Sequence, residues 1–467
     1  MTKKPNILFI LTDDQRFDTI NALGNNEIIT PIMDRLVEKG TAFTHAYIPG
    51  GTCPAVCIPS RAMIHTGRTL FHIEEDGSKI SSNYELIGET LKRIGYYTYG
   101  VGKWHNDINS YVRSFTNGDA IFFGGMWDHW NIPVCRFDPA GRYENIINFT
   151  PNFFFSNRTI KVHCDKFSTG KHSTEFITDT VIDFITHYDS EQPFFTYVAY
   201  MAPHDPRTMP QRFIDMYSSR QIDLPKNFMK EHPFDYGIRE IRDEILAPYP
   251  RTEEIIKRHI TEYYAMISHL DYEIGRILEA LDKTGKIDDT IIILAGDNGL
   301  ALGQHGLMGK QSIYEHSVRV PLVFTGPDIP RGLKVDNFVY LLDIYPTLCD
   351  LLRIEVPSSV EGKSFASMFS NPKIETRANL YLAYADLIRG IRTRKYKLIE
   401  YRGYANTTQL FDLENDPYET NDLSSKEEYA RVIAELRLEL EKFKDEWGDK
   451  LHPVGKRFWE NYDHIRT

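Results

Sequence analysis

The stretch NILFILTDD, residues 6–14, joins a short apolar run directly to two adjacent carboxylates. An uninterrupted run of Ile, Leu and Phe is typical of a strand that is buried on both faces of a sheet. Asp13 and Asp14 follow at once, and two carboxylates this close repel each other if they are buried without a cation. A pair of helix N-cap residues is the structural alternative for them. The stretch predicts a central strand with charge at its carboxyl end.

Four later runs repeat this pattern, and helical patterns lie between them. The runs are YYTYGVG (96–102), FFTYVAYM (194–201), TIIILAG (290–296) and VPLVFTG (320–326). Amphipathic helices are predicted over 31–40, 174–188 and 258–285. Strands that alternate with helices predict an α/β fold in which helices sandwich a mostly parallel central sheet.

The length and the net charge of the chain indicate its domain organisation and exclude one class of partner. The chain has 467 residues, beyond the size at which one core usually stops growing, and a net charge of −11. We predict a large domain over 1–372 and a small C-terminal α+β domain over 373–467, where short alternating strands precede a charged helix. The negative charge argues against a nucleic-acid partner, which requires a basic face.

No apolar run reaches the length that a membrane-spanning helix needs, so no membrane association is expected. The apolar run 6–11 is followed by acids and lacks a small-residue cleavage pattern, so it does not read as a signal peptide. We expect a soluble protein, cytoplasmic as written and periplasmic or secreted if a signal has been removed.

The polar residues that follow the apolar runs are the most informative feature of the chain. They are Asp13-Asp14, Lys103-Trp104-His105, His204 and Asp297-Asn298. Ligands of open α/β sheets bind outside the carboxyl ends of the strands. Any one of these groups could be a turn or a satisfied surface residue, but together they predict one shared site.

Four of these residues offer hard oxygen ligands to a cation: Asp13, Asp14, Asp297 and Asn298. Three carboxylates and an amide suit Ca²⁺, or Mg²⁺, better than zinc or copper, which favour imidazole and thiolate. A bound cation would also remove the repulsion between the adjacent carboxylates.

The stretch CPAVCIPSRAMIHTGR, residues 53–68, holds two of the five cysteines. Cys53 and Cys57 could form a metal pair or a disulfide, could both be small buried residues, or could include one reactive residue. The cysteines are odd in number and scattered, which disfavours a disulfide framework and a zinc site. Only Cys57 is followed by Pro59 and Arg61 at this spacing, and a small buried residue is the expectation for Cys53.

Cys57-Ile58-Pro59-Ser60-Arg61, continued by Thr66-Gly67-Arg68, resembles the signature of the type I, formylglycine-dependent sulfatases of the alkaline phosphatase-like superfamily. Further matches follow in the family's order: PNILFILTDDQR (5–16), TPIMDRLVEKGTAFTHAY (30–47), GKWH (102–105), APHDP (202–206), GDNGLALGQHGLMGKQSIYEHSVRVPL (296–322) and LFDLENDPYETNDL (410–423). The resemblance covers most of the chain. It implies the alkaline phosphatase-like fold, with residues 1–372 as the catalytic domain, and a sulfuric ester hydrolase.

The resemblance also implies a matured nucleophile. In that family a maturation enzyme, here an expected partner, oxidises the signature cysteine to Cα-formylglycine, which implies this change for Cys57. One hydroxyl of the hydrated aldehyde attacks sulfur and the other expels sulfate, which splits one difficult step into two. Asp13, Asp14, Asp297, Asn298 and the formylglycine would bind a divalent ion, most commonly Ca²⁺.

The other matched residues receive roles from the same resemblance. Arg61 would hold the hydrated formylglycine, and Lys103 and Lys310 would bind sulfate oxygens. His105 would deprotonate the second hydroxyl, and His204, with Lys310, would protonate the leaving alcohol.

Substrate recognition is expected to involve Arg207, Trp104 and the insert 124–171. Within the insert, Trp127, Trp130 and Phe153 could stack on sugars or belong to the core, and Arg136, Arg158 and Lys161 could meet anionic groups or lie on the surface. This insert and APHDPR are similar to bacterial enzymes that desulfate glycosaminoglycan fragments, so a sulfated oligosaccharide or small molecule is the expected substrate.

Two alternatives stay open. Phosphonate monoester and phosphodiester hydrolases resemble the same family and also use formylglycine. Their metal pair is commonly Asp-His, whereas this chain has Asp297-Asn298. The second alternative is a non-catalytic protein that binds sulfated glycan.

Overall fold

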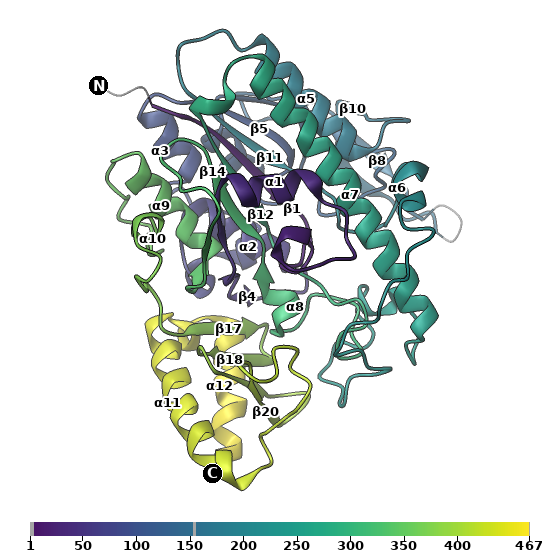
Figure 1. Ribbon diagram of the computed structural model, residues 1–467, viewed down its shortest axis with the longest axis vertical. Helices are drawn as coiled ribbons and strands as arrows, with labels where there is room; N and C mark the ends of the chain where they lie inside the picture. Colours follow the sequence, from purple (N-terminus) through teal and green to yellow (C-terminus); the bar gives the residue numbers. More distant parts are fainter. Residues whose placement is uncertain (1–3, 153–155, 467) are drawn as a thin grey trace.

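The computed structural model describes residues 4–152 and 156–466 (Figure 1). Its centre is β1 (Asn6–Thr12), which pairs in parallel with β11 (Phe194–Ala199) on one side and β12 (Thr290–Gly296) on the other. All seven residues of β12 are buried, as the apolar pattern predicted for a strand that is covered on both faces.

The central sheet has eight strands, and only β14 runs against the others. In spatial order they are β15 (Leu333–Val335), β2 (Thr41–Phe43), β14 (Leu322–Thr325), β12, β1, β11, β5 (Tyr97–Lys103) and β6 (Asn117–Phe122). The predicted mostly parallel sheet is therefore confirmed, and the run at 320–326 supplies its one antiparallel strand.

Alternate residues of β1 point into two separate cores. Leu8 and Ile10 join the core beneath α1 (Pro31–Lys39), α5 (Ser173–His187) and α7 (Glu253–Lys283). Ile7, Phe9 and Leu11 join the core beneath α2 (Cys57–Thr66), α3 (Ile87–Arg93), α4 (Ile108–Ser114) and α9 (Ile344–Leu351). The period-2 alternation of a strand thus produces the predicted helix–sheet–helix sandwich.

The long helix α7 begins with strong local signals. The Thr252 side chain accepts a hydrogen bond from the N–H of Ile255, and Glu253 and Glu254 stand in the first turn, where the helix dipole favours negative charge. Figure 1 shows α7 alongside α5 across the sheet.

A second sheet of five strands forms the lower lobe in Figure 1. Its order is β20 (Thr407–Asp412), β19 (Tyr396–Tyr401), β18 (Ile388–Arg392), β17 (Leu380–Tyr384) and β4 (Gly50–Gly51). The first four pair antiparallel, as predicted, but β4 comes from the N-terminal part of the chain and pairs in parallel with β17. The boundary at 372/373 stays a prediction.

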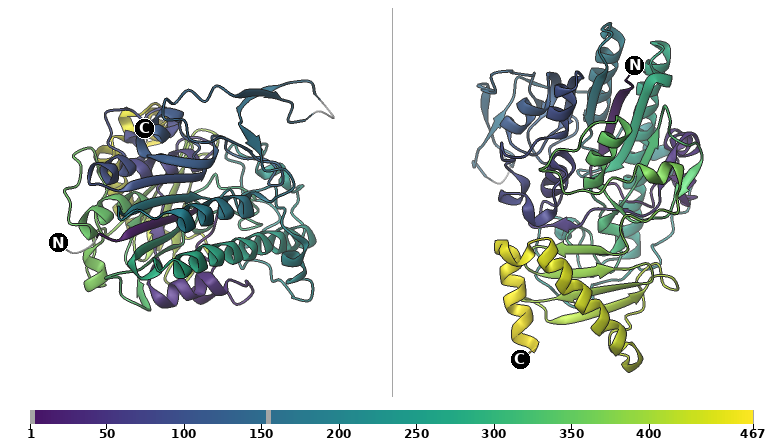
Figure 2. Two further views of the ribbon diagram at one scale, coloured as in Figure 1. Left: turned by 90° about the horizontal axis from the view of Figure 1, so that it is seen from above. Right: turned by 90° about the vertical axis from the view of Figure 1, so that its left-hand side faces the viewer.

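Two helices accompany this sheet. The predicted charged helix is α11 (Ala430–Glu446), which packs against β18 and β19. A second helix, α12 (Pro453–Arg466), follows it and was not predicted (Figure 2). Its side chains Phe458, Trp459 and Tyr462 enter the core.

Short elements complete the fold. β13 (Arg319–Val320), β3 (Ala46–Tyr47) and β16 (Val339–Tyr340) form a three-stranded sheet, and β7 (Pro133–Val134) pairs with β10 (Lys166–Phe167). In the insert, β8 (Ile146–Phe149) and β9 (Ile160–His163) form a hairpin that projects from the body (Figure 2). The remaining short helices are α6 (Gln211–Asp215), α8 (Glu315–Val318) and α10 (Ser367–Ser370). Within the described ranges, none of the helices is long and apolar enough to cross a bilayer.

Candidate active site

The signature cysteine is the first residue of a buried helix. α2 begins at Cys57, just after the segment that β4 fixes to the C-terminal sheet, and every α2 residue except Ile58 is buried. The helix ends at Gly67, whose φ of 65° is in the left-handed region and whose N–H donates to the carbonyl of Met63. Cys57 and Arg61, one turn apart, share the helix face that meets the carboxyl ends of the central strands.

Three ion pairs between buried groups form the centre of the site. They are Asp13 Oδ2–Lys103 Nζ at 2.5 Å, Asp14 Oδ1–Lys310 Nζ at 2.6 Å and Asp297 Oδ2–Arg61 Nε at 2.9 Å. Asn298 Nδ2 also donates to Asp14 Oδ1 at 2.6 Å. The strand-end residues at 13, 14, 103, 297 and 298 therefore meet, as predicted, although the chain separates them by up to 285 positions.

The oxygen atoms of this cluster fit a hard divalent cation. Asp13 Oδ1 and Asn298 Oδ1 are buried and have no hydrogen-bond partner among the described residues. Ligand atoms of Asp13, Asp297 and Cys57 lie within 4.8 Å of one another. Burial, and then the Asp13 carboxylate, raise the pKa of Asp297 to about 7, because two buried carboxylates repel each other unless a cation compensates them. A Ca²⁺ or Mg²⁺ ion prefers oxygen ligands and would satisfy these unpaired acceptors.

Cationic and imidazole nitrogens surround the Cys57 sulfur. His105 Nδ1 lies 3.3 Å from Sγ, Lys103 Nζ 3.8 Å and Lys310 Nζ 4.0 Å. In the matured residue that the family signature implies, a hydroxyl oxygen would take the place of this Sγ. Burial raises the pKa of the Cys57 thiol, and the two lysines offset this only in part, so the unmodified group stays a thiol rather than a reactive thiolate.

The two histidines of the site differ in their surroundings. Burial, and then Lys103, lower the pKa of His105 well below its ordinary value, so its ring is neutral and able to accept a proton. His204 Nδ1 donates to the carbonyl of Asp205 at 2.8 Å, which leaves Nε2 facing Asp14 Oδ2 at 3.6 Å. Both rings therefore lie beside the carboxylate cluster.

Arg61 is held by two partners. Its Nε and Nη2 each lie 2.9 Å from Asp297 Oδ2, and its Nη1 donates to the carbonyl of Lys103 at 2.8 Å. In this structure Arg61 therefore fixes a proposed metal ligand and the strand end that carries Lys103. Its predicted contact with a matured residue 57 stays a prediction.

Two sequence-based expectations are wrong. Trp104, expected to contact substrate, is 0% exposed, and its indole N–H donates to the carbonyl of Asp107. It packs edge-on against Tyr111 and Tyr197, so it belongs to the core. Cys53, expected to be buried, is partly exposed, with Sγ 3.6 Å from the carbonyl of Ala55. All five cysteines are free thiols, so the open question of a Cys53–Cys57 disulfide is answered.

The predicted substrate residues lie in different environments. Arg207 is half-buried, with Nη1 2.7 Å from His259 Nδ1. In the insert, Trp127 packs on Phe149 and Trp130 on His172. The cations Arg136, Arg158 and Lys161 are exposed, and Phe153 lies outside the described residues.

Sequence reasoning missed residues that support the site from loops. Asp205 accepts from Arg242, whose side chain is 41% exposed. Asp243 accepts from Gln311, next to Lys310, at 2.7 Å. Arg242 and Asp243 come from a segment without a strand or a quoted motif, whereas their partners Asp205 and Gln311 lie in the motifs at 202–206 and 296–322.

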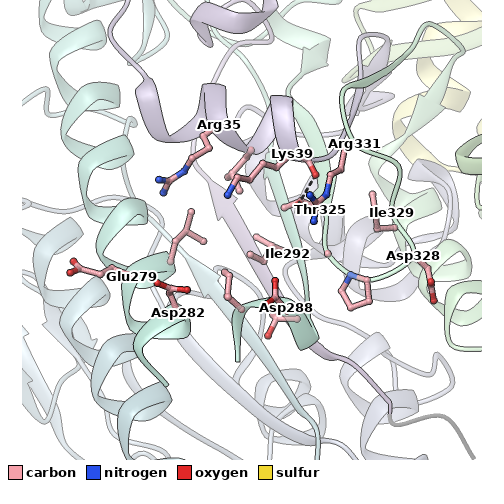
Figure 3. Close-up of a pocket in the computed structure, with 16 residues that line it drawn as sticks. Arg35, Lys39, Glu279, Asp282, Asp288, Ile292, Thr325, Asp328, Ile329 and Arg331 are labelled. Atoms are coloured by element: carbon pink, nitrogen blue, oxygen red, sulfur yellow. Dashed lines mark hydrogen bonds between the residues drawn. The ribbon is translucent and has the colours of Figure 1, made fainter. Parts of the chain in front are cut away.

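A cavity of about 670 Å³ lies away from this cluster (Figure 3). The cavity is lined by Thr290, the first residue of β12, and by Thr325, the last residue of β14. Asp297 follows the opposite end of β12, so the cavity and the carboxylate cluster lie at opposite ends of this strand. Arg35, Lys39 and Arg331 stand on one side of it and Glu279, Asp282 and Asp288 on the other (Figure 3). It contains none of the predicted site residues.

Comparisons with known proteins show which family the chain resembles. A family model described as sulfatase matches residues 5–354, and one described as N-sulphoglucosamine sulphohydrolase, C-terminal, matches residues 303–446. An arylsulfatase of Clostridium perfringens is 31% identical over 93% of both chains. An N-acetylglucosamine-6-O-sulfatase of Bacteroides thetaiotaomicron is 27% identical over 96% of this chain and 88% of its own.

Two solved structures share the fold at a TM-score of 0.76. One is a complex with its substrate D-glucosamine-2-N,6-O-disulfate, 24% identical, covering 97% of this chain and 99% of its own. The other is a phosphonate monoester hydrolase of Agrobacterium radiobacter, 21% identical, covering 95% and 96%. Fold likeness alone therefore does not separate the two reactions.

Proposed function

The chain belongs to the sulfatase family and is a sulfuric ester hydrolase, and from that premise we propose that it desulfates a carbohydrate of the glycosaminoglycan-fragment type. The proposed nucleophile is a formylglycine formed from Cys57. The proposed cofactor is a divalent cation, Ca²⁺, held by Asp13, Asp14, Asp297 and Asn298. The similarity to an N-acetylglucosamine-6-O-sulfatase over nearly the whole chain supports a sugar substrate.

The observation that carries the proposal is the convergence of three nitrogens on residue 57, at 3.3, 3.8 and 4.0 Å from Sγ. When present, the hydrated formylglycine supplies a hydroxyl nucleophile, and the cation supplies positive charge that lowers the pKa of that hydroxyl. Lys103 and Lys310 bring two ammonium groups that hold the oxygens of a sulfate group and compensate its charge.

His105 and His204 carry out the proton transfers of the proposed reaction. His105 is neutral because of its burial, and its Nδ1 faces residue 57, so it accepts a proton from that residue when sulfate is released. His204 keeps Nδ1–H on the Asp205 carbonyl, so the proton given to the leaving alcohol is the Nε2–H of its imidazolium form, in which both ring nitrogens carry a proton. A sugar hydroxyl is a poor leaving group, so this proton matters more for a sugar ester than for an aryl ester.

Arg207 is the proposed contact for a further anionic group of the substrate. Among the described residues no carboxylate lies within ion-pair distance of its guanidinium, and its Nε is buried without a hydrogen-bond partner. Burial lowers the pKa of Arg207, although nearby Asp205 opposes this, so the charge is poorly compensated. A carboxylate or second sulfate on the substrate would supply the missing partner. Arg207→Met should then lower kcat/KM for a disulfated sugar more than for a monosulfated one.

Mass spectrometry of the peptide that contains residue 57, from the native host, tests the nucleophile. We expect the mass of formylglycine or its hydrate. A mass fixed at unmodified cysteine in that host would exclude the proposed nucleophile and its maturation partner.

Turnover of three substrates tests the reaction class: a sulfated disaccharide, an aryl sulfate and an aryl phosphonate. We expect the highest kcat/KM for the sulfated disaccharide. The phosphonate monoester hydrolase with the same fold makes the phosphonate the informative competitor. Fastest turnover of that substrate would replace the proposal with the phosphonate alternative, and binding of sulfated sugar without turnover by the matured protein would favour the glycan binder.

A further inference from the structure

A second cluster of ligand-type side chains lies between α5 and α7. Glu175 comes from the first turn of α5, and His269 and Glu273 come from adjacent turns of α7. One ligand atom from each of the three lies within 4.8 Å of the others. None of these residues belongs to the catalytic cluster.

His269 is the informative member, because it is buried without a partner. Its side chain is 1% exposed, and neither ring nitrogen has a hydrogen bond to any residue that the structure describes. Its Nε2 points at Glu175 Oε1 from 3.6 Å, which is too far for a hydrogen bond. Phe213, stacked on the ring at a centroid distance of 4.6 Å, and His172, at 4.8 Å, fix its orientation. A buried imidazole left unpaired in this way is costly unless a ligand completes it.

The charges around His269 leave room for a cation. Glu273, 2% exposed, pairs with Arg276 at 2.6 Å, and Arg276 also pairs with Asp179 at 2.6 Å. Lys171 pairs with Asp179 as well. Arg212 is a further positive charge near His269. Among the described residues, Glu175 has no ion pair with a lysine or arginine, so its carboxylate is available to a metal ion.

We propose that Glu175, His269 and Glu273 bind a divalent transition-metal ion, with Zn²⁺ as the best match. One imidazole and two carboxylates are a zinc-type ligand set, unlike the all-oxygen set of the catalytic cluster. Glu175 is 26% exposed, so solvent reaches one side of the site and an ion can enter there. The ion would cross-link α5 to α7, and its role is structural.

A line of histidines connects this site to the catalytic loop. His172 stacks on His129 at 4.9 Å with the two rings nearly parallel, and His129 Nε2 donates to the carbonyl of His204 at 3.0 Å. The ion would therefore also steady the loop that carries His204, but its primary effect is on stability.

The test is Zn²⁺ binding to the full chain kept in excess Ca²⁺, so that the catalytic cluster is not the available site. Isothermal titration calorimetry gives stoichiometry and affinity, and differential scanning fluorimetry gives the melting temperature. We expect one Zn²⁺ equivalent and a rise in melting temperature of several degrees. His269→Phe, which keeps the ring stack but removes the ligand, should lose that equivalent, and Glu175→Gln should weaken it at least tenfold.

Glu279→Gln is the matched control, because Glu279 lies on the same helix, is 61% exposed and pairs only with Lys283 in the described structure. It should bind Zn²⁺ as the wild type does. Equal Zn²⁺ stoichiometry and affinity in the wild type and Glu175→Gln would overturn the proposal, as would the absence of a Zn²⁺ equivalent in the wild type. Glu175→Gln is conservative and partly exposed, so the test does not depend on whether His269→Phe folds.

Discussion

Gly125 lies directly against the ring of His105. A Cβ at position 125 would stand 2.5 Å from Nε2 and 2.8 Å from Cε1 of His105. On its other side the ring presents Nδ1 to Cys57 at 3.3 Å, and His105 itself has a φ of 65°, a left-handed conformation that costs energy for a non-glycine residue. The missing side chain of Gly125 is thus what allows His105 to face residue 57.

Gly125→Ala should therefore reduce turnover by displacing His105. We expect kcat to fall at least tenfold, about 1.4 kcal/mol of barrier, with a smaller change in KM. Met126→Ala, at the exposed next residue, is the control and should keep most of the activity. Steady-state kinetics and melting temperature check this, and an unchanged kcat in Gly125→Ala would show that His105 can move without loss.

Removal of the proposed divalent cation should destabilise the protein as well as inactivate it. Chelation with EDTA should lower the melting temperature of the wild type, because Asp13, Asp14 and Asp297 lose a counter-ion. Asp297→Ala should abolish turnover, lower the melting temperature, and remove the part of the EDTA effect that added Ca²⁺ reverses. Full activity in this variant, or an equal EDTA effect in both proteins, would contradict the metal assignment.

Acid should destabilise the fold through a buried histidine to which the sequence assigned no role. His65 on α2 is 0% exposed against Trp104, and burial, and then Arg61, lower its pKa to about 3. The unfolded chain protonates this group near pH 6.5, so its contribution is complete above that pH and is lost as pH falls toward 3. At pH 5 the loss is roughly 2 kcal/mol for this one group.

His65→Phe should therefore flatten the pH dependence of unfolding between pH 6.5 and 5. Urea unfolding at several pH values measures this. The exposed His187 offers a control, and His187→Gln should leave the slope as it is in the wild type. The same slope in all three proteins would mean that His65 is protonated in the folded state.

A buried lysine in the C-terminal sheet holds the segment that follows Lys310. Lys397 Nζ pairs with Glu315 at 2.8 Å and with Glu419 at 2.7 Å, and all three side chains are buried. Lys397→Met leaves two carboxylates without this cation and should cost about 3–5 kcal/mol of stability. Adding Glu419→Gln should restore part of it.

Lys395→Met, two residues away and 43% exposed, is the matched control and should change the stability little, because an exposed ion pair contributes little. Denaturant unfolding checks both changes. An unfolding free energy of Lys397→Met equal to that of this control would show that the contacts of Lys397 with Glu315 and Glu419 do not hold the C-terminal sheet to the active site.

The sequence alone was sufficient to predict the strands and the polar residues that follow their carboxyl ends. The runs at 6–11 and 290–296 became β1 and β12, because only a strand buried on both faces accommodates so continuous an apolar run. Parallel neighbours end at the same edge of the sheet, so Asp13 and Asp297 had to meet. The same reasoning failed for Trp104, because alternation along a chain does not say whether a neighbouring helix covers the residue.

By itself the sequence determined the fold class and the chemical inventory of the site: strand-end carboxylates, lysines, histidines and the CxPSR motif. The tertiary structure decided how that inventory is held. It placed β4 in the C-terminal sheet, Gly125 against His105, and Arg242 on Asp205. These contacts join short segments that are separated in sequence and carry no periodic pattern. Whether such residues meet depends on the packing of the whole chain, which local propensity does not encode.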